Sequence, residues 1–258
     1  MISICAVPAS DPSIPATFPG ALVTETRVRH GSVPALGHPG WAEALPWLVQ
    51  GTTTRGDGAH PFDLGLFSVA SAPREVMSNW SALAAGTGMR TVAHAHQVHG
   101  PAVRLHRATH PGLHVYEPCD GHATCDPGVL LAVTTADCIP VSMVDPETRA
   151  VALVHAGWRG VAAGVVERGA EVLRERLGVP SARLLVHLGP AICGRCYEVG
   201  PEVFQALGLD AREGPAPLDL RVAVARRVAA LGVREESISV SSHCTRCGDA
   251  GLFSHRAG

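Results

Sequence analysis

Residues 128–160 read GVLLAVTTADCIPVSMVDPETRAVALVHAGWRG, and their pattern indicates the fold class. Three apolar runs rich in β-branched residues lie at 128–134, 139–144 and 150–155, and the turn sequence DPET at 145–148 separates the last two. Short apolar runs bounded by turn residues are typical of buried strands. The stretch therefore predicts three buried strands that meet at loops.

A helical pattern begins directly after this stretch. From 160 to 177, apolar residues such as Val161 and Leu173 recur at helical spacing beside Glu and Arg, and Gly178 ends the pattern. Further strands are expected over 91–98, 103–106, 184–188 and 238–241, and further helices over 79–85, 201–207 and 218–231. Because no stretch resembles a linker, we expect one domain over 46–258. Residues 1–45, rich in Pro, Ala and Gly, are expected to form an irregular lead-in.

The composition excludes several chemistries. All 21 basic residues are arginine, so Schiff-base catalysis and a P-loop lysine are excluded, and a bound anion must be held by arginine, backbone N–H groups or a metal. The net charge of −2, spread along the chain, argues against a nucleic-acid partner. The sequence shows neither a signal peptide nor a membrane span, so we expect a cytoplasmic protein with no membrane partner.

Three side chains that bind metals stand where predicted strands meet loops. They are His99 in QVHG, Cys138 in TADC and His155 in HAGW. Two histidines and one cysteine suit zinc, and three protein ligands leave one position open for water or substrate, as in catalytic sites. Taken alone, a His or Cys in an apolar strand is more often a packed core residue than a metal ligand. Their wide spacing matches no local metal motif, so spacing alone leaves both interpretations open.

Longer motifs resemble a known family. They are QVHG at 97–100, TADCIPV at 135–141, HAGWRG at 155–160, GPAI at 189–192 with YEVG at 197–200, and Cys244-Thr245 followed by FSHR at 253–256. Their content and order resemble the polyphenol oxidase or laccase-domain family, whose members resemble purine nucleoside phosphorylases. The resemblance runs from about Arg55 to the C-terminus, and TADC together with HAGWRG is highly specific.

The resemblance implies a fold, a site and an activity. The fold is α+β, with a mixed β-sandwich flanked by helices in a single domain, and the site is zinc bound by His99, Cys138 and His155. The activity is phosphorolysis of adenosine, inosine, guanosine and methylthioadenosine, with adenosine deamination in addition. Purine nucleosides and phosphate are then the partners, and the oligomeric state stays open.

Five residues in or near these motifs are candidates for catalysis or substrate binding, beside Cys138 itself. Arg159 in HAGWRG is the first choice for a phosphate or ribose contact, and Arg55 is the second; ion pairs with neighbouring carboxylates are the alternative. Asp137 adjoins Cys138 and is a candidate orienter of a ligand histidine, a proton acceptor or a turn cap. Asp63 stands where the family more often has Asn. Glu198 in YEVG contacts substrate or seals the helix that follows.

Other functions are compatible with the same residues. His94-Ala95-His96 suggests copper, and copper at the three-ligand site would make a laccase-like polyphenol oxidase. Multicopper oxidases, however, need several such His pairs, and this chain has a single one. Cys138 with a neighbouring histidine could instead serve as the nucleophile of a cysteine hydrolase. A non-catalytic metal-binding protein is the third alternative.

A second cysteine constellation departs from the family pattern. Two C-x-x-C pairs, Cys193 with Cys196 and Cys244 with Cys247, are separated by 47 residues. Four cysteines match the ligand count of a structural zinc site, although the separation is longer than in a zinc ribbon. Free thiols or a reversible disulfide are the alternatives. A single zinc ion in the intact chain would exclude a second site.

Overall fold

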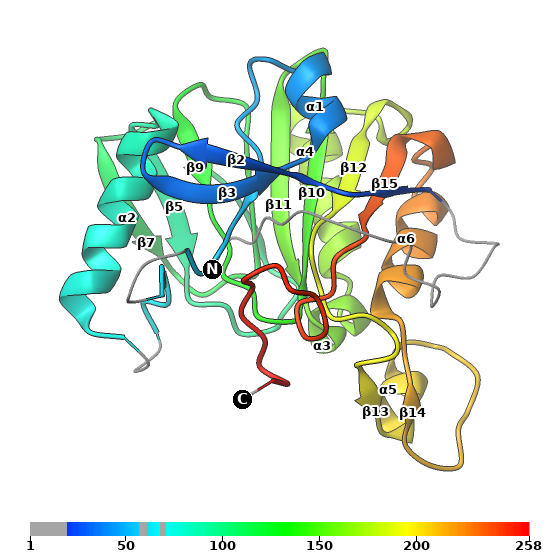
Figure 1. The fold of residues 1–258 in the computed structure, drawn as a ribbon. Coiled ribbons are helices and arrows are strands. Elements are labelled where there is room, and N and C mark those ends of the chain that lie inside the picture. Colours follow the sequence, from blue (N-terminus) through cyan, green and yellow to red (C-terminus); the bar gives the residue numbers. More distant parts are fainter. Residues whose placement is uncertain (1–19, 57–60, 68–70, 258) are drawn as a thin grey trace.

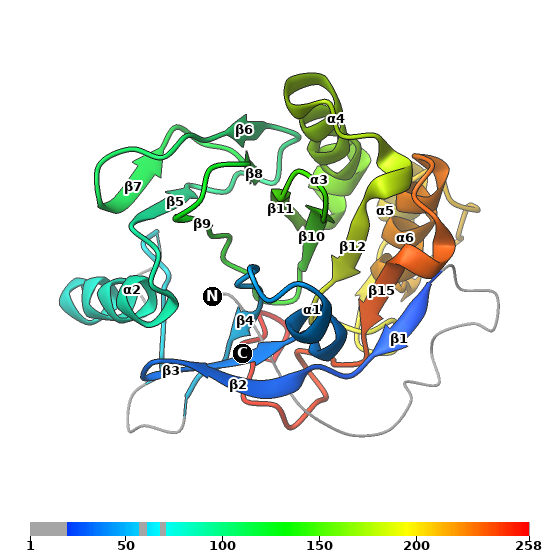
Figure 2. The same ribbon diagram turned by 90° about the horizontal axis from the view of Figure 1, so that it is seen from above.

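The computed structural model describes residues 20–56, 61–67 and 71–257. Within these residues the largest sheet has seven strands in the order β1-β15-β12-β10-β11-β8-β6; its central strands are labelled in Figure 1 and the whole order can be followed in Figure 2. Neighbouring strands run antiparallel from β12 to β8 and parallel at both edges. The strands are β1 (Ala21–Val23), β15 (Ile238–Ser241), β12 (Leu185–Leu188), β10 (Ile139–Asp145), β11 (Ala150–Ala156), β8 (Gly121–Thr124) and β6 (Val103–Leu105).

The hairpin of β10 and β11 is the centre of this sheet. Ile139 pairs with Ala156 and Asp145 with Ala150, so the chain reverses at residues 146–149. Both strands are buried along most of their length, which explains their nearly continuous apolar sequence. The strands predicted over 139–144 and 150–155 are confirmed. The first predicted run, 128–134, forms the shorter strand β9 (Val129–Leu131) in a different sheet.

Helices cover one face of the main sheet. α4 (Val165–Leu177) packs on β11, β8 and β6, and α6 (Leu220–Ala230) packs on β12 and β15 (Figure 2). Val154, Leu173 and Val224 are fully buried in the core between these layers. Within the part of the chain that the structure describes, no helix combines the length and the apolar character that a membrane crossing requires.

Smaller sheets cover the opposite face. Ala93 and Leu131, from the sheet β7-β5-β9, pack against Val151 and Leu153 of β11. The arrangement confirms the expected single domain of mixed sheets and flanking helices. The remaining elements are β2 (Thr26–His30), β3 (Val33–Gly37), α1 (Pro39–Ala44), β4 (Thr52–Thr53), α2 (Pro73–Thr87), β5 (Thr91–Ala95), β7 (Gly112–Tyr116), α3 (Trp158–Ala162), β13 (Glu198–Val199), α5 (Pro201–Ala206), β14 (Ala216–Pro217) and the 3-10 turns Ser181–Arg183 and Glu235–Ser237.

Residues 1–45 were expected to form an irregular lead-in, but the described part of this segment contains regular strands and a helix. Residues 1–19 lie outside the described residues, but residues 20–45 hold β1, β2, β3 and α1. β1 pairs in parallel with β15 and so extends the main sheet. β1 has little local signal because its stability comes from pairing with the distant β15, whereas β2 and β3 form a local hairpin that the composition of the segment conceals.

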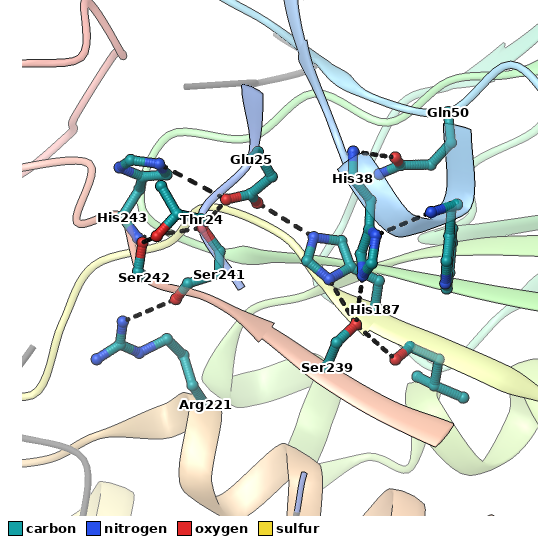
Figure 3. A network of polar contacts seen from close by, with 12 residues as sticks. Thr24, Glu25, His38, Gln50, His187, Arg221, Ser239, Ser241, Ser242 and His243 are labelled. Carbon is teal, nitrogen blue, oxygen red and sulfur yellow. Dashed lines mark hydrogen bonds and ion pairs between the residues drawn. The ribbon is translucent and has the colours of Figure 1, made fainter. Parts of the chain in front are cut away.

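A buried polar network holds this segment to the main sheet (Figure 3). Glu25, between β1 and β2, accepts hydrogen bonds from His187 of β12 at 3.1 Å and from Ser241 of β15 at 2.9 Å. The other ring nitrogen of His187 lies 2.9 Å from the Ser239 hydroxyl, which also contacts His38 at 3.2 Å. Because all these groups are buried, each depends on the others for its hydrogen bonds.

Replacing Glu25 is expected to destabilise the fold. Glu25→Ala leaves His187 and Ser241 without their acceptor in a dry environment, so the free energy of unfolding should fall by roughly 2–4 kcal/mol in urea titrations. Glu43→Ala, on the exposed side of α1, is the matched control and should change it by less than about 0.5 kcal/mol. Equal stability of the two variants would contradict a structural role for the network.

Candidate metal centre

Two loops and the end of strand β11 bring His99, Cys138 and His155 together. Cys138 immediately precedes β10, and the register of the hairpin places it beside the end of β11, where His155 lies. His99 arrives from the loop after β5, with its backbone in the left-handed region at φ 58°. One potential ligand atom from each residue lies within 4.8 Å of the others, and Cys138 Sγ is 4.0 Å from His99 Nε2.

Asp120, just before β8, is the residue that organises this cluster. Its fully buried carboxylate accepts a hydrogen bond from His155 Nδ1 at 2.8 Å. It also accepts the backbone N–H groups of Val98, His99 and Gly100 at 3.0, 2.9 and 2.8 Å. One carboxylate therefore orients the His155 ring and fixes the loop that carries His99. An aspartate before a glycine is a common turn pattern, so nothing in the sequence distinguished it.

Cys138 and His155 stabilise each other's charged forms, a thiolate and an imidazolium. Burial raises the pKa of the Cys138 thiol, but hydrogen bonds and charge from His155 and His99 outweigh it and lower the pKa to about 7. Burial lowers the pKa of His155, but the hydrogen bond to Asp120 and the interaction with Cys138 raise it to about 9. The hydrogen bond to Asp120 holds one ring proton on Nδ1, so Nε2 is the nitrogen that would bind a metal. The metal would displace the proton that the raised pKa retains on Nε2 at neutral pH.

The donor set fits a zinc ion. Tetrahedral zinc places nitrogen and sulfur ligands about 3.3–3.8 Å apart, slightly closer than the 4.0 Å between Cys138 Sγ and His99 Nε2. Gly157 provides the space: a Cβ there would lie 2.8 Å from both Cys138 Sγ and His99 Cδ2. His99 is exposed and Cys138 is half-buried, so the cluster is open to solvent on one side. Three donors with an open side are typical of catalytic rather than structural zinc.

The Asp137 carboxylate binds the C-terminal segment rather than a histidine ring. It accepts the Thr245 hydroxyl at 2.5 Å and the backbone N–H of Arg256 at 2.8 Å. The contact to a ligand histidine is made by Asp120 instead. The Asp137 backbone has φ 85°, a strained conformation for a residue with a side chain. These long-range contacts hold that conformation beside Cys138.

Arg159 and Arg256 lie near Tyr197, which in turn lies near Cys138. Burial, followed by the charge of Cys138, raises the pKa of Tyr197 to about 12, while Arg256 and Arg159 oppose the shift. Arg159 is exposed, and its guanidinium carbon lies 4.3 Å from the centre of the Trp158 ring. The guanidinium carbon of Arg256 lies 5.3 Å from the centre of the Tyr197 ring. Arg159 was a candidate from the sequence, whereas Tyr197 and Arg256 are placed here by the fold.

The other predicted substrate contacts lie on separate segments. The backbone N–H of Arg55 donates to Gly251 at 2.7 Å, and its guanidinium carbon lies 5.4 Å from the Phe253 ring centre, so Arg55 adjoins the segment that carries Arg256. Asp63 accepts the N–H of its neighbour Gly65 at 2.9 Å, in a turn. Glu198 is exposed on β13. Among the described residues, no hydrogen bond, ion pair or ring contact joins Arg55, Asp63 or Glu198 to the potential metal ligands.

The comparison with protein families agrees with these motifs. The family described as multi-copper polyphenol oxidoreductase laccase matches residues 49–258, which is most of the chain. The chain belongs to this laccase-domain family. His94 and His96, the pair that suggested copper, are in neither group of potential metal ligands found among the described residues. The His94 ring is buried, with Nδ1 3.1 Å from the carbonyl oxygen of Ala132.

Relatives of this laccase-domain protein carry enzyme names. A purine nucleoside phosphorylase of Mycobacterium tuberculosis is 40% identical over 218 residues, covering 80% of this chain and 85% of its own. An adenosine deaminase from an unknown prokaryotic organism is 35% identical over 151 residues, covering 54% and 57%. The crystal structure of YlmD from Geobacillus stearothermophilus has a TM-score of 0.76 at 30% identity, covering 86% and 90%.

Proposed function

We propose that the protein is a zinc-dependent purine nucleoside phosphorylase acting on adenosine, inosine, guanosine and methylthioadenosine, with adenosine deaminase activity. The supporting observation is the convergence of His99, Cys138 and His155 around an open position, with His155 oriented by Asp120. The enzyme names of the relatives support the same assignment. Zinc bound there would supply Lewis-acid stabilisation of developing negative charge and would acidify water at the open position.

The residues of the chain supply binding, orientation and proton control. Phosphorolysis joins a phosphate oxygen to C1′ of the ribose as the C1′–N9 bond breaks and the purine leaves with a proton. Because the chain has no lysine, phosphate must be held by guanidinium groups, backbone N–H groups or the metal. Arg159 is exposed beside the cluster and is our first choice, and Arg256 adjoins it through Tyr197.

Tyr197 and Asp137 have complementary proposed roles. With its pKa raised to about 12, the Tyr197 hydroxyl keeps its proton at neutral pH and can donate a hydrogen bond to phosphate or to the leaving base. Asp137 positions Cys138 by binding Thr245 and the backbone of Arg256. Arg55, Asp63 and Glu198 are proposed as further substrate contacts.

The phosphate requirement is the test of this proposal. Purified protein is incubated with adenosine or inosine, with and without phosphate, and the bases are separated by chromatography. Free base should appear with phosphate and be reduced at least about a hundredfold without it, since phosphate is then the missing nucleophile. Deamination of adenosine should be lost after chelation of the metal and return with zinc.

Other outcomes of the nucleoside assay would contradict the proposal or favour one of the alternative functions. No product from any nucleoside would indicate a non-catalytic metal-binding protein. Copper-dependent oxidation of phenols without phosphorolysis would indicate a laccase-like oxidase. Deamination that is unchanged after complete metal removal would contradict the metal's role in that reaction.

A further inference from the structure

The two C-x-x-C pairs lie at the same edge of the main sheet. Cys193 and Cys196 follow β12, and Cys244 and Cys247 follow β15. β12 and β15 are parallel neighbours, so their carboxyl ends lead both cysteine turns to one place. Ala191 and Cys244 form an isolated parallel bridge there, which continues the pairing beyond the strands. One sulfur from each of the four cysteines lies within 4.8 Å of the others.

The sulfur separation matches a metal site better than a disulfide. Cys193 Sγ and Cys247 Sγ are 3.9 Å apart. A disulfide needs about 2.05 Å between sulfurs, whereas two thiolates on one tetrahedral zinc ion, each about 2.3 Å from the metal, lie about 3.8 Å apart. The observed separation agrees with the second value.

Backbone N–H groups surround one sulfur of the cluster. Cys244 Sγ accepts from the N–H of Cys193 at 3.3 Å and from those of Arg246 and Cys247 at 3.4 Å. Sulfur is a weak acceptor as a thiol, so three donors on one sulfur indicate a site arranged for a thiolate. Four thiolates at this spacing would repel one another, so all four thiols can lose their protons only when a cation is bound between them. The sulfur spacing and the three donors to Cys244 Sγ together favour a metal ion over free thiols.

We propose that Cys193, Cys196, Cys244 and Cys247 bind a second zinc ion, distinct from the one assigned to His99, Cys138 and His155. The four thiols release their protons to solvent as four sulfur–zinc bonds form. Four protein ligands leave no open coordination position, so this ion is structural. The proposal goes beyond the nucleoside reaction and does not depend on it.

The second ion would stabilise the two cysteine loops, which contact Asp137 beside the three-ligand cluster. Each cysteine loop contributes a hydrogen bond to Asp137: Ile192 N–H donates to its carbonyl oxygen at 3.0 Å, and the Thr245 hydroxyl donates to its carboxylate at 2.5 Å. Asp137 precedes Cys138 and has the strained φ of 85°. By joining the two loops, the ion would help to hold Asp137, and through it Cys138, in place.

Metal analysis of the full chain tests the proposal. Protein isolated without added metal should contain about two zinc ions per chain by elemental mass spectrometry, and Cys247→Ser, at the exposed member of the cluster, should reduce this to about one. Cys125→Ser, at a half-buried cysteine in neither cluster, is the matched control and should retain about two. A Cys247→Ser protein with an unchanged zinc content would overturn the proposal, as would disulfides among these cysteines in protein isolated without oxygen.

Cobalt substitution provides a readout that is independent of the stability of Cys247→Ser. Among the described residues, the Cys138→Ala background leaves the four-cysteine cluster as the one group of potential metal ligands that offers thiolates. We expect cobalt(II) bound there to show the strong sulfur-to-cobalt charge-transfer absorption of a tetrahedral thiolate site. Absence of this absorption would overturn the proposal even if Cys247→Ser fails to fold. Because neither measurement uses a nucleoside, failure of the proposed enzyme activity leaves this test unaffected.

Discussion

Cys138→Ala is expected to remove the zinc bound by His99 and His155 and to reduce kcat/KM for phosphorolysis at least about a thousandfold. Two histidines alone leave the ion without its thiolate, whose pKa of about 7 makes it an available ligand at neutral pH. Loss of the several kcal/mol that a Lewis acid contributes to the transition state corresponds to a rate change of this size. Elemental analysis and steady-state kinetics on the same preparation measure both effects.

The metal content separates a ligand from a nucleophile at this position. A nucleophile variant would lose activity and keep its metal, whereas a ligand variant loses both. Cys125→Ala, at another half-buried cysteine, is the control and should retain activity and zinc. An inactive Cys138→Ala protein with unchanged zinc content would favour the cysteine hydrolase alternative and contradict the metal centre proposed above.

Asp120→Asn is expected to lower zinc affinity at this centre by about 10–100-fold and the free energy of unfolding by roughly 3 kcal/mol. Each carboxylate oxygen receives two donors: Oδ1 from His99 N–H and His155 Nδ1, and Oδ2 from the N–H groups of Val98 and Gly100. An amide has a single acceptor oxygen, so two of the four donors would face its NH₂ group. The His155 ring would lose its orientation, or the His99 loop would lose its anchor.

Zinc competition with a chelating dye and urea unfolding measure the two effects of Asp120→Asn. Asp126→Asn is the matched control, because Asp126 also accepts a backbone N–H, from Ala108 at 2.8 Å, but lies outside the cluster. It should retain zinc affinity within about threefold. Unchanged affinity in Asp120→Asn would show that the hydrogen bond to His155 does not orient a metal ligand.

Sequence motifs selected the three side chains that the structure groups as potential metal ligands, but they missed the residue that arranges them. His99, Cys138 and His155 were recognisable because metal-binding residue types stood at the ends of predicted strands, and the structure brings them together. Asp120 was missed because its role depends on backbone donors 20–22 residues away and on a histidine 35 residues away. Asp137 was selected for its adjacency to Cys138, yet its carboxylate binds the C-terminal segment.

The sequence by itself determined the local elements and the available chemistry. The apolar runs of β10 and β11, the amphipathic pattern of α4 and the absence of lysine all follow from residues read in order, because burial periodicity and functional-group inventory are local properties. Only the tertiary structure decided that β1 joins the main sheet, that Asp120 links the His99 loop to His155 of β11, and that four distant cysteines share one sheet edge. These relations arise from strand pairing between remote segments, whose register no local pattern encodes.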